Sequence, residues 1–397
     1  MKTTNYNRRN WLKTGLLTAG GITLLPHIGL AEMSKAPIPL TKDGNALYSP
    51  FFKEFLPSKF PEPEQLLAKL NANENPYGPS PKAIEALQGA AHKGNRYAWS
   101  DLFDLVEKIA TKEGVDPKNI MMGPGSSDLL EKTAMVLFMK GGNIVSADPS
   151  YMSLIRVAEA TGASWKGIPL KEDWSHDLKA MEAAIDSETK LIYICNPNNP
   201  TGSLTDAKEL LDFCSRVSTK VPVFIDEAYL GFLEDGDKQS MVSLINEGKD
   251  VIIARTFSKI HGMAGLRVGY VVAQEKTLDK IQEITRGGMG VSFPSIYAAM
   301  ASMDDVEFQT KSRTLNTEAR DYVCVYLKKM GYDYIPSYTS FVIFPIEMDG
   351  KQFLEKMISK KVGVRAFEIL GKNWCRVSIG TMDEMKIFTK ALSEVLV

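Results

Sequence analysis

The sequence is poor in the residues that build metal centres and disulfide frameworks. Among its 397 residues are four scattered cysteines, Cys195, Cys214, Cys324 and Cys375, and no Cys-x-x-Cys pair. The four histidines are equally dispersed. We therefore expect no metal site. A Gly-x-Ser-x-Gly motif is also missing, which argues against a serine hydrolase of the kind that needs it.

Neither sign of charge is in excess. The chain has 47 Lys and Arg against 48 Asp and Glu, so its formal net charge is −1. No overall field favours an anionic membrane, and we expect no nucleic-acid partner. With 44% hydrophobic residues, the composition is that of a globular protein large enough for two or three domains.

The N-terminal segment differs from the rest of the chain. Arg8 and Arg9 precede a tryptophan, a leucine and a lysine, then a mildly apolar stretch, with Gly29 and Ala31 two apart. This pattern resembles a twin-arginine export signal with a cleavage site. The resemblance implies a signal peptide at residues 1–31, the twin-arginine machinery as a partner and a periplasmic location, with membrane tethering if the signal stays uncleaved. An amphipathic helix or a membrane anchor is the alternative, although the stretch is short and weak for a spanning helix.

From about residue 100 the chain alternates helical patterns with short apolar runs, which is typical of βαβ units. Helices are expected at residues 101–114 and 126–139, the second capped by Ser126 or Ser127. The runs "NIVSADP", "KLIYICNP", "VPVFIDEA" and "DVIIARTFSK" lack polar alternation, as strands covered on both faces do. The pattern predicts an α/β fold with a mostly parallel central sheet.

The pattern changes near residue 300. A charged helical stretch at 304–330 precedes the apolar run "FVIFPIEM", another helical stretch and "WCRVSIGT". These segments predict a smaller α+β domain. We expect an N-terminal arm at 32–70 that contributes to the small domain, a large domain at 71–300 and the small domain at 301–397.

A polar residue follows or ends each of the apolar runs. These residues are Tyr151, Asn199, Asp226 and Lys259. In open α/β sheets, ligands bind beyond the carboxyl ends of the strands, so we expect the four side chains to converge on one crevice. A lysine is costly to bury unless its amine is used.

Three motifs taken together identify a family. "NPTG" at 199–202, "FIDEAY" at 224–229 and "SKIHGMAGLRVGY" at 258–270 are similar to fold type I pyridoxal-phosphate enzymes of aminotransferase class I/II. The stretch "LNANENPYGPSPKAIEAL" at 70–87 resembles the histidinol-phosphate aminotransferase branch. The resemblance implies an aspartate-aminotransferase-like fold with pyridoxal 5'-phosphate (PLP) in the large domain. It also implies ping-pong transfer of an amino group from an amino acid to a 2-oxo acid.

The resemblance assigns a role to each strand-end residue. Lys259 forms the imine with PLP and carries the proton between substrate and cofactor. Asp226 keeps the ring nitrogen protonated, whereas strand alternation would point the adjacent Glu227 away. Asn199 and Tyr229 are expected to hydrogen-bond the phenolic oxygen of the cofactor.

Other matches concern the ring and the phosphate. Tyr151 would stack on the ring, with an ordinary buried tyrosine as the alternative. The phosphate is expected at a helix N-terminus with a hydroxyl and a cation beside it. The residues implied are Gly125, Ser126, Ser127, Ser258 and Arg267. A nucleotide P-loop ending is missing there, which disfavours an NTPase.

The remaining matches concern the subunit partner and the substrate. Tyr97 resembles a tyrosine that reaches the phosphate from a neighbouring subunit, which implies a homodimer. Arg376 matches the arginine that binds the substrate carboxylate, and Arg365 lies where the histidinol-phosphate branch has a second arginine; a surface position is the alternative for each. Asn75 and Tyr77 are expected to close over the substrate.

One segment departs from the histidinol-phosphate branch. Residues 286–295 read "RGGMGVSFPS", with glycines where that branch has an aromatic residue and an asparagine. Whether histidinol phosphate is a substrate therefore stays open. A racemase, a decarboxylase or a β-lyase on the same cofactor is an alternative, and so is a non-catalytic exported binding protein. The carboxylate-binding arginine favours transamination or racemisation over decarboxylation.

Overall fold

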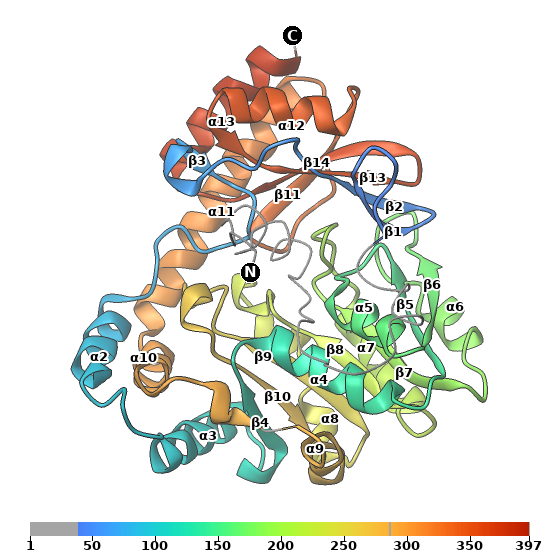
Figure 1. The fold of residues 1–397 in the computed structure, drawn as a ribbon, viewed down its shortest axis with the longest axis vertical. Helices are drawn as coiled ribbons and strands as arrows, with labels where there is room; N and C mark the ends of the chain where they lie inside the picture. The colour runs from blue at the N-terminus through green and yellow to red at the C-terminus, as the bar shows by residue number, and fades with distance from the viewer. Residues whose placement is uncertain (1–38, 286, 397) are drawn as a thin grey trace, which may run out of the picture.

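A computed structural model describes residues 39–285 and 287–396 of the chain (Figure 1). Its strands are β1 Ala46–Ser49, β2 Phe52–Phe55, β3 Ala68–Lys69, β4 Ile120–Gly123, β5 Asn143–Asp148, β6 Ser164–Pro169, β7 Thr189–Cys195, β8 Val223–Asp226, β9 Val251–Thr256, β10 Gly269–Ala273, β11 Phe341–Ile346, β12 Val362–Gly363, β13 Arg365–Ile369 and β14 Lys372–Ser378. Its α-helices are α2 Pro81–Ala91, α3 Trp99–Glu113, α4 Ser126–Phe138, α5 Ser153–Ala160, α6 Leu178–Ala183, α7 Ala207–Val217, α8 Ser243–Asn246, α9 Glu275–Gln282, α10 Phe293–Asp304, α11 Val306–Lys329, α12 Gly350–Ser359 and α13 Met382–Leu396. The signal peptide expected at residues 1–31 lies outside the described residues.

A seven-stranded sheet forms the centre of the molecule, in the order β4-β10-β9-β8-β7-β5-β6. The strands β9, β8, β7, β5 and β6 run parallel, and β10 is antiparallel to both of its neighbours. The predicted α/β fold with a mostly parallel sheet is confirmed. The four apolar runs form β5, β7, β8 and β9.

Helices cover both faces of this sheet. On β7, Leu191 and Tyr193 pack into the core that contains residues of α4, α5 and α9. Ile192 and Ile194 point the other way, into a second core with residues of α3, α6, α7 and α10. Because both faces are buried, the strands have no need for polar alternation.

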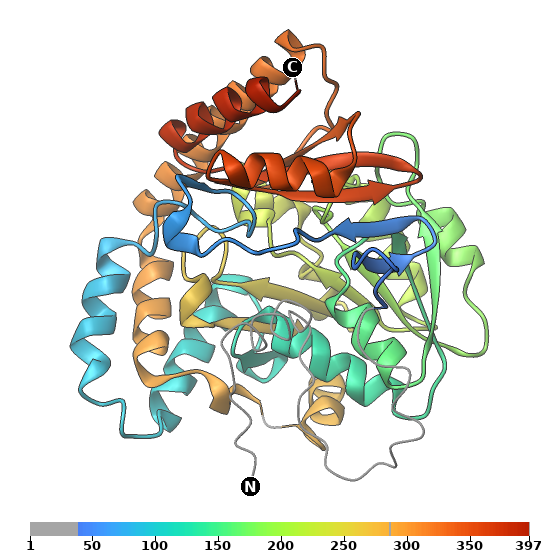
Figure 2. The ribbon, with the colours of Figure 1, turned by 45° about the horizontal axis from the view of Figure 1, so that its top comes forward.

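A smaller antiparallel sheet has the order β1-β2-β13-β14-β11 (Figures 1 and 2). One face carries residues such as Val342 and Val377, which pack against α11, α12 and α13. Residues of the opposite face, including Phe52, Phe367 and Trp374, join the core of the large sheet. The blue strands of the N-terminal arm thus lie beside the red C-terminal strands, and the second face of this sheet borders the large domain.

The helix expected over 304–330 is confirmed as α11, which covers residues 306–329 and is capped by Asp305, whose carboxylate accepts a hydrogen bond from the Phe308 amide. One helix cap differs from the sequence-based expectation. The N-cap of α4 is Gly125, with φ of 87°, instead of Ser126 or Ser127. The expected serine cap is therefore wrong, and the first turn of α4 has no side-chain cap.

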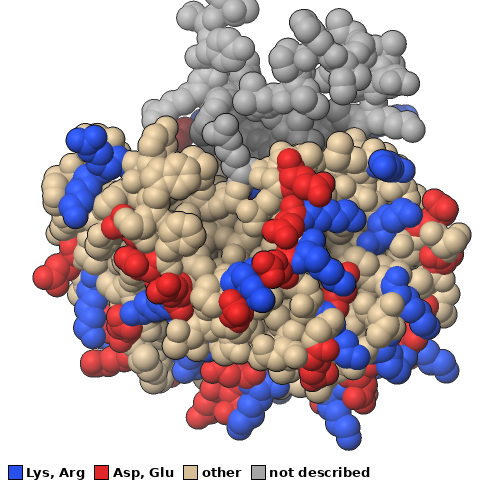
Figure 3. Space-filling model, turned by 90° about the horizontal axis from the view of Figure 1, so that it is seen from below, with Lys and Arg blue, Asp and Glu red and all other residues tan. Residues whose placement is uncertain are grey.

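Charge is evenly mixed on the face seen in Figure 3, where basic and acidic side chains alternate. This agrees with the near-neutral net charge of the chain. Within residues 39–285 and 287–396, no helix is both long and apolar enough to span a membrane.

Candidate active site

The carboxyl ends of the parallel strands bring distant residues together. Asp226 ends β8, and Asn199, Tyr229 and Lys259 follow β7, β8 and β9. The Asn199 Nδ2 donates a hydrogen bond to the Tyr229 hydroxyl at 3.5 Å, and the Lys259 Nζ lies 5.4 Å from the centroid of the Tyr229 ring. Asp226 and Lys259 each lie within electrostatic range of the other. The structure therefore clusters these four residues at one edge of the sheet.

Lys259 is half-buried, and a hydrogen bond fixes its amine. Its Nζ donates a hydrogen bond to the backbone oxygen of Asn73 at 3.0 Å. Burial, followed by the positive charge of Arg376, lowers the pKa of Lys259 from 10.5 to about 8. Near neutral pH, the fraction of uncharged amine is raised by about two orders of magnitude over an ordinary lysine. An amine of this kind is a competent nucleophile and proton carrier.

Asp226 supplies the negative charge of the cluster. It is 3% exposed, and burial raises the pKa of Asp226 to about 6. The Ala228 amide and the Tyr193 hydroxyl donate hydrogen bonds to its two oxygens at 3.2 and 3.5 Å. Glu227 points to the other side of the strand, as alternation predicts, and its carboxylate lies 3.1 Å from Arg255.

The N-terminus of α4 forms a tight turn with β10. Gly125 needs its positive φ, and a Cβ there would collide with the guanidinium of Arg267. A Cβ on Gly269 would collide with the backbone nitrogen of Ser126. Glycine at both positions lets the backbone amides of the first turn and an arginine approach the same point.

One cation and three hydroxyl groups lie at this helix terminus. The Arg267 Nη1 donates to the Ser258 hydroxyl at 3.3 Å, and its Nη2 donates to the Pro124 oxygen at 3.2 Å. The Ser127 and Tyr151 hydroxyls lie 3.4 Å apart. A helix N-terminus with an arginine and hydroxyl groups is suited to bind a phosphate. Through its contact with Ser127, the Tyr151 hydroxyl lies beside the N-terminus of α4.

Arg376, on β14, faces the cluster from the small sheet. Its Nη1 donates a hydrogen bond to the Asn199 Oδ1 at 2.6 Å, while its buried Nε has no hydrogen-bond partner in the described part of the chain. Its guanidinium carbon lies 5.0 Å from the centroid of the Phe341 ring. A buried guanidinium with an unpaired donor is suited to an anionic ligand.

Arg365 lies on β13 opposite Arg376 in the sheet register, but its charge is already paired. Its Nε donates to a carboxylate oxygen of Glu54, on β2, at 2.7 Å. Of the two arginines expected to bind substrate, Arg376 is therefore the one with an unpaired charge.

Asn75 and Tyr77 border the lysine segment. The Asn75 Nδ2 donates to the Ile260 backbone oxygen at 3.0 Å, and the Tyr77 amide donates to Asn75 Oδ1 at 3.1 Å. Both line a small pocket with Asn316 and Gly380. Within the described residues Tyr97 does not join the cluster, since it is 78% exposed with its ring against Trp99.

Sequence reasoning missed Asn73. It is buried, with φ of 52°, and its backbone oxygen accepts the hydrogen bond from Lys259. Its side-chain amide donates to the Tyr229 hydroxyl at 3.0 Å and accepts from the Ser378 hydroxyl at 2.8 Å. The one sign of this role in the sequence is the asparagine-rich run at residues 71–75, because asparagine tolerates the left-handed backbone region that Asn73 adopts.

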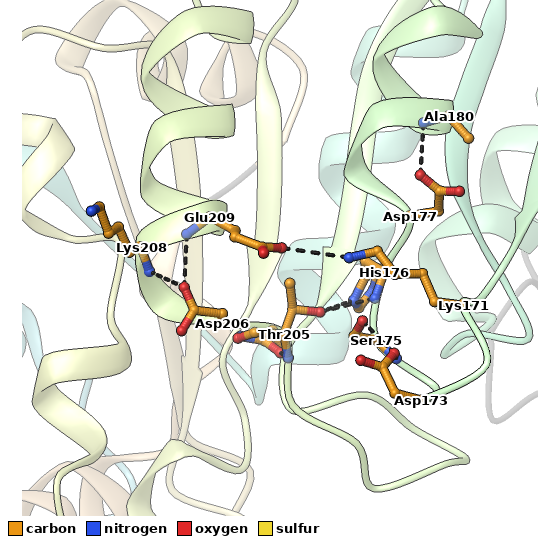
Figure 4. Close-up of polar contacts among 11 residues, drawn as sticks. Lys171, Asp173, Ser175, His176, Asp177, Ala180, Thr205, Asp206, Lys208 and Glu209 are labelled. Carbon is orange, nitrogen blue, oxygen red and sulfur yellow. Dashed lines mark hydrogen bonds and ion pairs between the residues drawn. The ribbon is translucent and has the colours of Figure 1, made fainter.

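The loop that carries Asn199 continues to Thr205, which contacts His176 in the segment before α6 (Figure 4). The Thr205 hydroxyl lies 2.7 Å from the His176 Nδ1, and the Thr205 amide donates to the Asn196 Oδ1 at 2.9 Å. Asp206 then caps α7 by accepting from the amides of Lys208 and Glu209 at 3.0 Å. These bonds fix the loop that places Asn199 between Tyr229 and Arg376.

Comparison with known proteins agrees with this geometry. The model of the family "Aminotransferase class I and II" matches residues 67–392. The histidinol-phosphate aminotransferase of Moorella thermoacetica is 36% identical over 83% of this chain and 85% of its own length. The structure of the histidinol-phosphate aminotransferase from Sinorhizobium meliloti in complex with pyridoxal-5'-phosphate has a TM-score of 0.78 at 27% identity, covering 85% of this chain and 95% of that one. For the fold alone, aspartate aminotransferase from Thermotoga maritima has a TM-score of 0.71 at 20% identity, over 83% of this chain and 91% of that one.

Proposed function

Because the chain belongs to the class I and II aminotransferases and is a PLP-dependent transaminase, we propose that Lys259, Asp226 and Arg376 are its central reactive and binding groups. The protein moves an amino group from an amino acid to a 2-oxo acid in two half-reactions. The residue assignment rests on the Lys259 amine, which lies close enough to the buried Asp226 and Arg376 to interact with them electrostatically. Burial and the charge of Arg376 lower the pKa of Lys259 to about 8.

The residues present fit PLP in three respects. A phosphate would meet the uncapped first turn of α4 with Gly125, Ser126 and Ser127, together with Ser258 and Arg267. The buried carboxylate of Asp226 would face the ring nitrogen, and Tyr229 with Asn199 would hydrogen-bond the phenolic oxygen. Tyr151 would cover the ring. When bound, PLP supplies the aldehyde that forms an imine with an amine, and a pyridine ring that accepts the electron pair left at the substrate Cα.

The chain's own groups would then divide the work. Arg376 would bind the substrate carboxylate through donors that include its unpaired Nε, which fixes the orientation of the Cα. Lys259, once released by the substrate amine, would take the proton from the substrate Cα and deliver it to the carbon of the cofactor that carried the aldehyde. The charge of Asp226 would keep the ring nitrogen protonated throughout.

The test is a pair of spectroscopic half-reactions on PLP-loaded protein. A panel of amino acids should convert the visible absorbance of the imine to that of the amino form, and 2-oxoglutarate or pyruvate should restore it. Loss of CO2 or formation of the D-enantiomer without this conversion would instead indicate a decarboxylase or a racemase. A spectrum that no amino acid changes would contradict transamination.

We also propose that the active unit is a homodimer in which Tyr97 reaches the phosphate of the partner subunit. Three aromatic residues near the start of α3 support this, since Tyr97, Trp99 and Phe103 are 78, 56 and 67% exposed. Exposed apolar clusters of this kind mark contact surfaces. Sedimentation of the wild type and Phe103→Glu tests the proposal. A monomeric wild type with full activity would contradict it.

For localisation we propose export by the twin-arginine route to the periplasm. The support is the sequence pattern around Arg8 and Arg9 alone. Changing both to lysine and fractionating cells should move the protein to the cytoplasm. An unchanged distribution would refute the proposal, and mature protein in the membrane fraction would indicate an uncleaved signal.

A further inference from the structure

We propose that Glu54, contributed by the N-terminal arm, neutralises Arg365 and thereby matches the substrate site to a singly charged carboxylate instead of a doubly charged phosphate monoester. The proposal rests on the assignment of this region as the substrate site. It names Glu54 as a residue that determines specificity.

Glu54 is firmly held. It is 5% exposed on β2, and its Oε1 accepts from the Arg365 Nε at 2.7 Å. Its Oε2 accepts from the Tyr48 hydroxyl at 2.6 Å. Both carboxylate oxygens are therefore engaged. Arg365 is partly exposed, so separating the pair would chiefly leave the buried Glu54 carboxylate without its countercharge, which is unfavourable.

The ion pair of Glu54 and Arg365 lies next to Arg376, whose charge has no carboxylate partner within the described residues. Arg365 and Arg376 are register partners across β13 and β14, and the side chains of Glu54, Arg365 and Arg376 all point to the face that borders the large domain. The charge of Arg365 lowers the pKa of Arg376, and the charge of Glu54 raises it. The three charged groups therefore lie close enough to interact electrostatically. Two arginines and one carboxylate leave a net charge of +1.

A single positive charge suits a single negative one. An amino acid brings one carboxylate, which neutralises the site when it binds Arg376. A phosphate monoester carries about −1.5 to −2 near neutral pH, so it would add uncompensated negative charge beside Glu54. At Arg365 it would compete with the Glu54 carboxylate, which already accepts hydrogen bonds from Arg365 and Tyr48.

The chain offers matched variants for a test. Glu54→Gln removes the charge and keeps the shape, which raises the net charge of the site to +2. The double variant Glu54→Gln/Arg365→Gln returns it to +1. As a control, Glu368→Gln removes a carboxylate that joins the same two strands through Lys53, at 2.6 Å, on the opposite face of the sheet.

The PLP-loaded proteins are compared in half-reactions with L-histidine and histidinol phosphate, which share an imidazole and differ in the anion. We expect the wild type to favour histidine, and Glu54→Gln to shift the ratio of kcat/KM at least tenfold toward histidinol phosphate. The double variant and Glu368→Gln should keep the wild-type ratio. A wild type that prefers histidinol phosphate, or a Glu54→Gln ratio equal to that of the wild type, would overturn the proposal while leaving transamination intact.

A binding measurement covers the case in which neither amine reacts. Titration of the PLP-loaded proteins with acetate and with methyl phosphate, followed by cofactor absorbance, reports the preference for one or two charges directly. Glu54→Gln should bind methyl phosphate at least tenfold more tightly than the wild type, with a smaller change for acetate. Equal gains for both anions, or none, would refute the proposal.

Discussion

The Nη1 of Arg376 donates a hydrogen bond to the Oδ1 of Asn199 at 2.6 Å, although 177 residues separate the two in the chain. This bond joins β14 of the small sheet to the loop that follows β7 of the large one. Asn199 in turn contacts Tyr229 at 3.5 Å. The proposed carboxylate ligand and a proposed cofactor ligand are therefore positioned by one another.

Replacing Arg376 by lysine tests this arrangement. Lysine keeps the positive charge but loses the planar fork that binds a carboxylate and Asn199 together. Loss of charged hydrogen bonds predicts a fall in kcat/KM for amino acids of about 10- to 100-fold. Arg216→Lys, in an ion pair with Glu182 on the surface, is the matched control and should leave kcat/KM unchanged. Equal kinetics for both variants would argue against Arg376 as the carboxylate ligand.

Lys259→Ala should remove both the visible absorbance and the reaction. Without the amine no imine with the protein forms, and the lost proton transfer predicts a rate lower by about 10²- to 10⁴-fold. Absorbance spectra of PLP-reconstituted protein and single-turnover rates with an amino acid measure the two effects. Lys280→Ala, on the exposed face of α9, should behave as the wild type. A coloured, active Lys259→Ala protein would contradict the assignment.

The lowered pKa of Lys259 predicts how PLP loading depends on pH. Only the uncharged amine attacks an aldehyde, so the rate of recombination of the apoprotein with PLP should rise through about pH 8 instead of about 10.5. In Arg376→Met the midpoint should move upward, because the charge of Arg376 helps to lower this pKa. Stopped-flow loading rates across pH 6 to 10 would check both midpoints. A wild-type midpoint near that of free lysine would contradict the prediction.

The same shift predicts a change in stability. Between about pH 8 and 10.5 the unfolded chain holds a proton at Lys259 that the folded apoprotein has released. The free energy of unfolding should therefore rise with pH across this window because of Lys259. Denaturant titrations of the apoprotein and of Lys259→Met should differ in pH slope there. Parallel slopes would show that Lys259 titrates normally.

Gly269→Ala should disturb the phosphate end of the site from a distance. The added Cβ collides with the Ser126 backbone nitrogen and must displace the first turn of α4. Overpacking of this kind costs about 1–3 kcal/mol and should also weaken PLP binding. Gly265→Ala is the control, since a Cβ there meets nothing within 4 Å. Thermal unfolding with and without PLP separates the two effects.

The large sheet could be predicted from the sequence because its strands are buried on both faces. The four apolar runs predict strands, and they form β5, β7, β8 and β9. The residues at their carboxyl ends meet because parallel strands end at the same edge of the sheet. The same pattern predicts that Asp226 and Lys259 lie at this edge. Their chemical roles remain predictions.

The parts that the sequence did not reveal depend on long-range contacts. Glu54 is a charged residue in a four-residue strand, and nothing local indicates that Arg365, 311 positions later, makes it a buried residue. Asn73 acts through a backbone oxygen, which every residue has. By contrast, the helix at 304–330 was predictable because its pattern is local, and it corresponds to α11 within two residues at its start.

The pairing of β2 with β13 also bears on how the protein is made. The strand β2 leaves the ribosome well before its neighbour β13, which begins at Arg365. The small sheet therefore closes only after the chain has been synthesised as far as β13 and β14. A product truncated before residue 365 would keep β1 and β2 with an open edge, and such edges pair readily with other nascent chains.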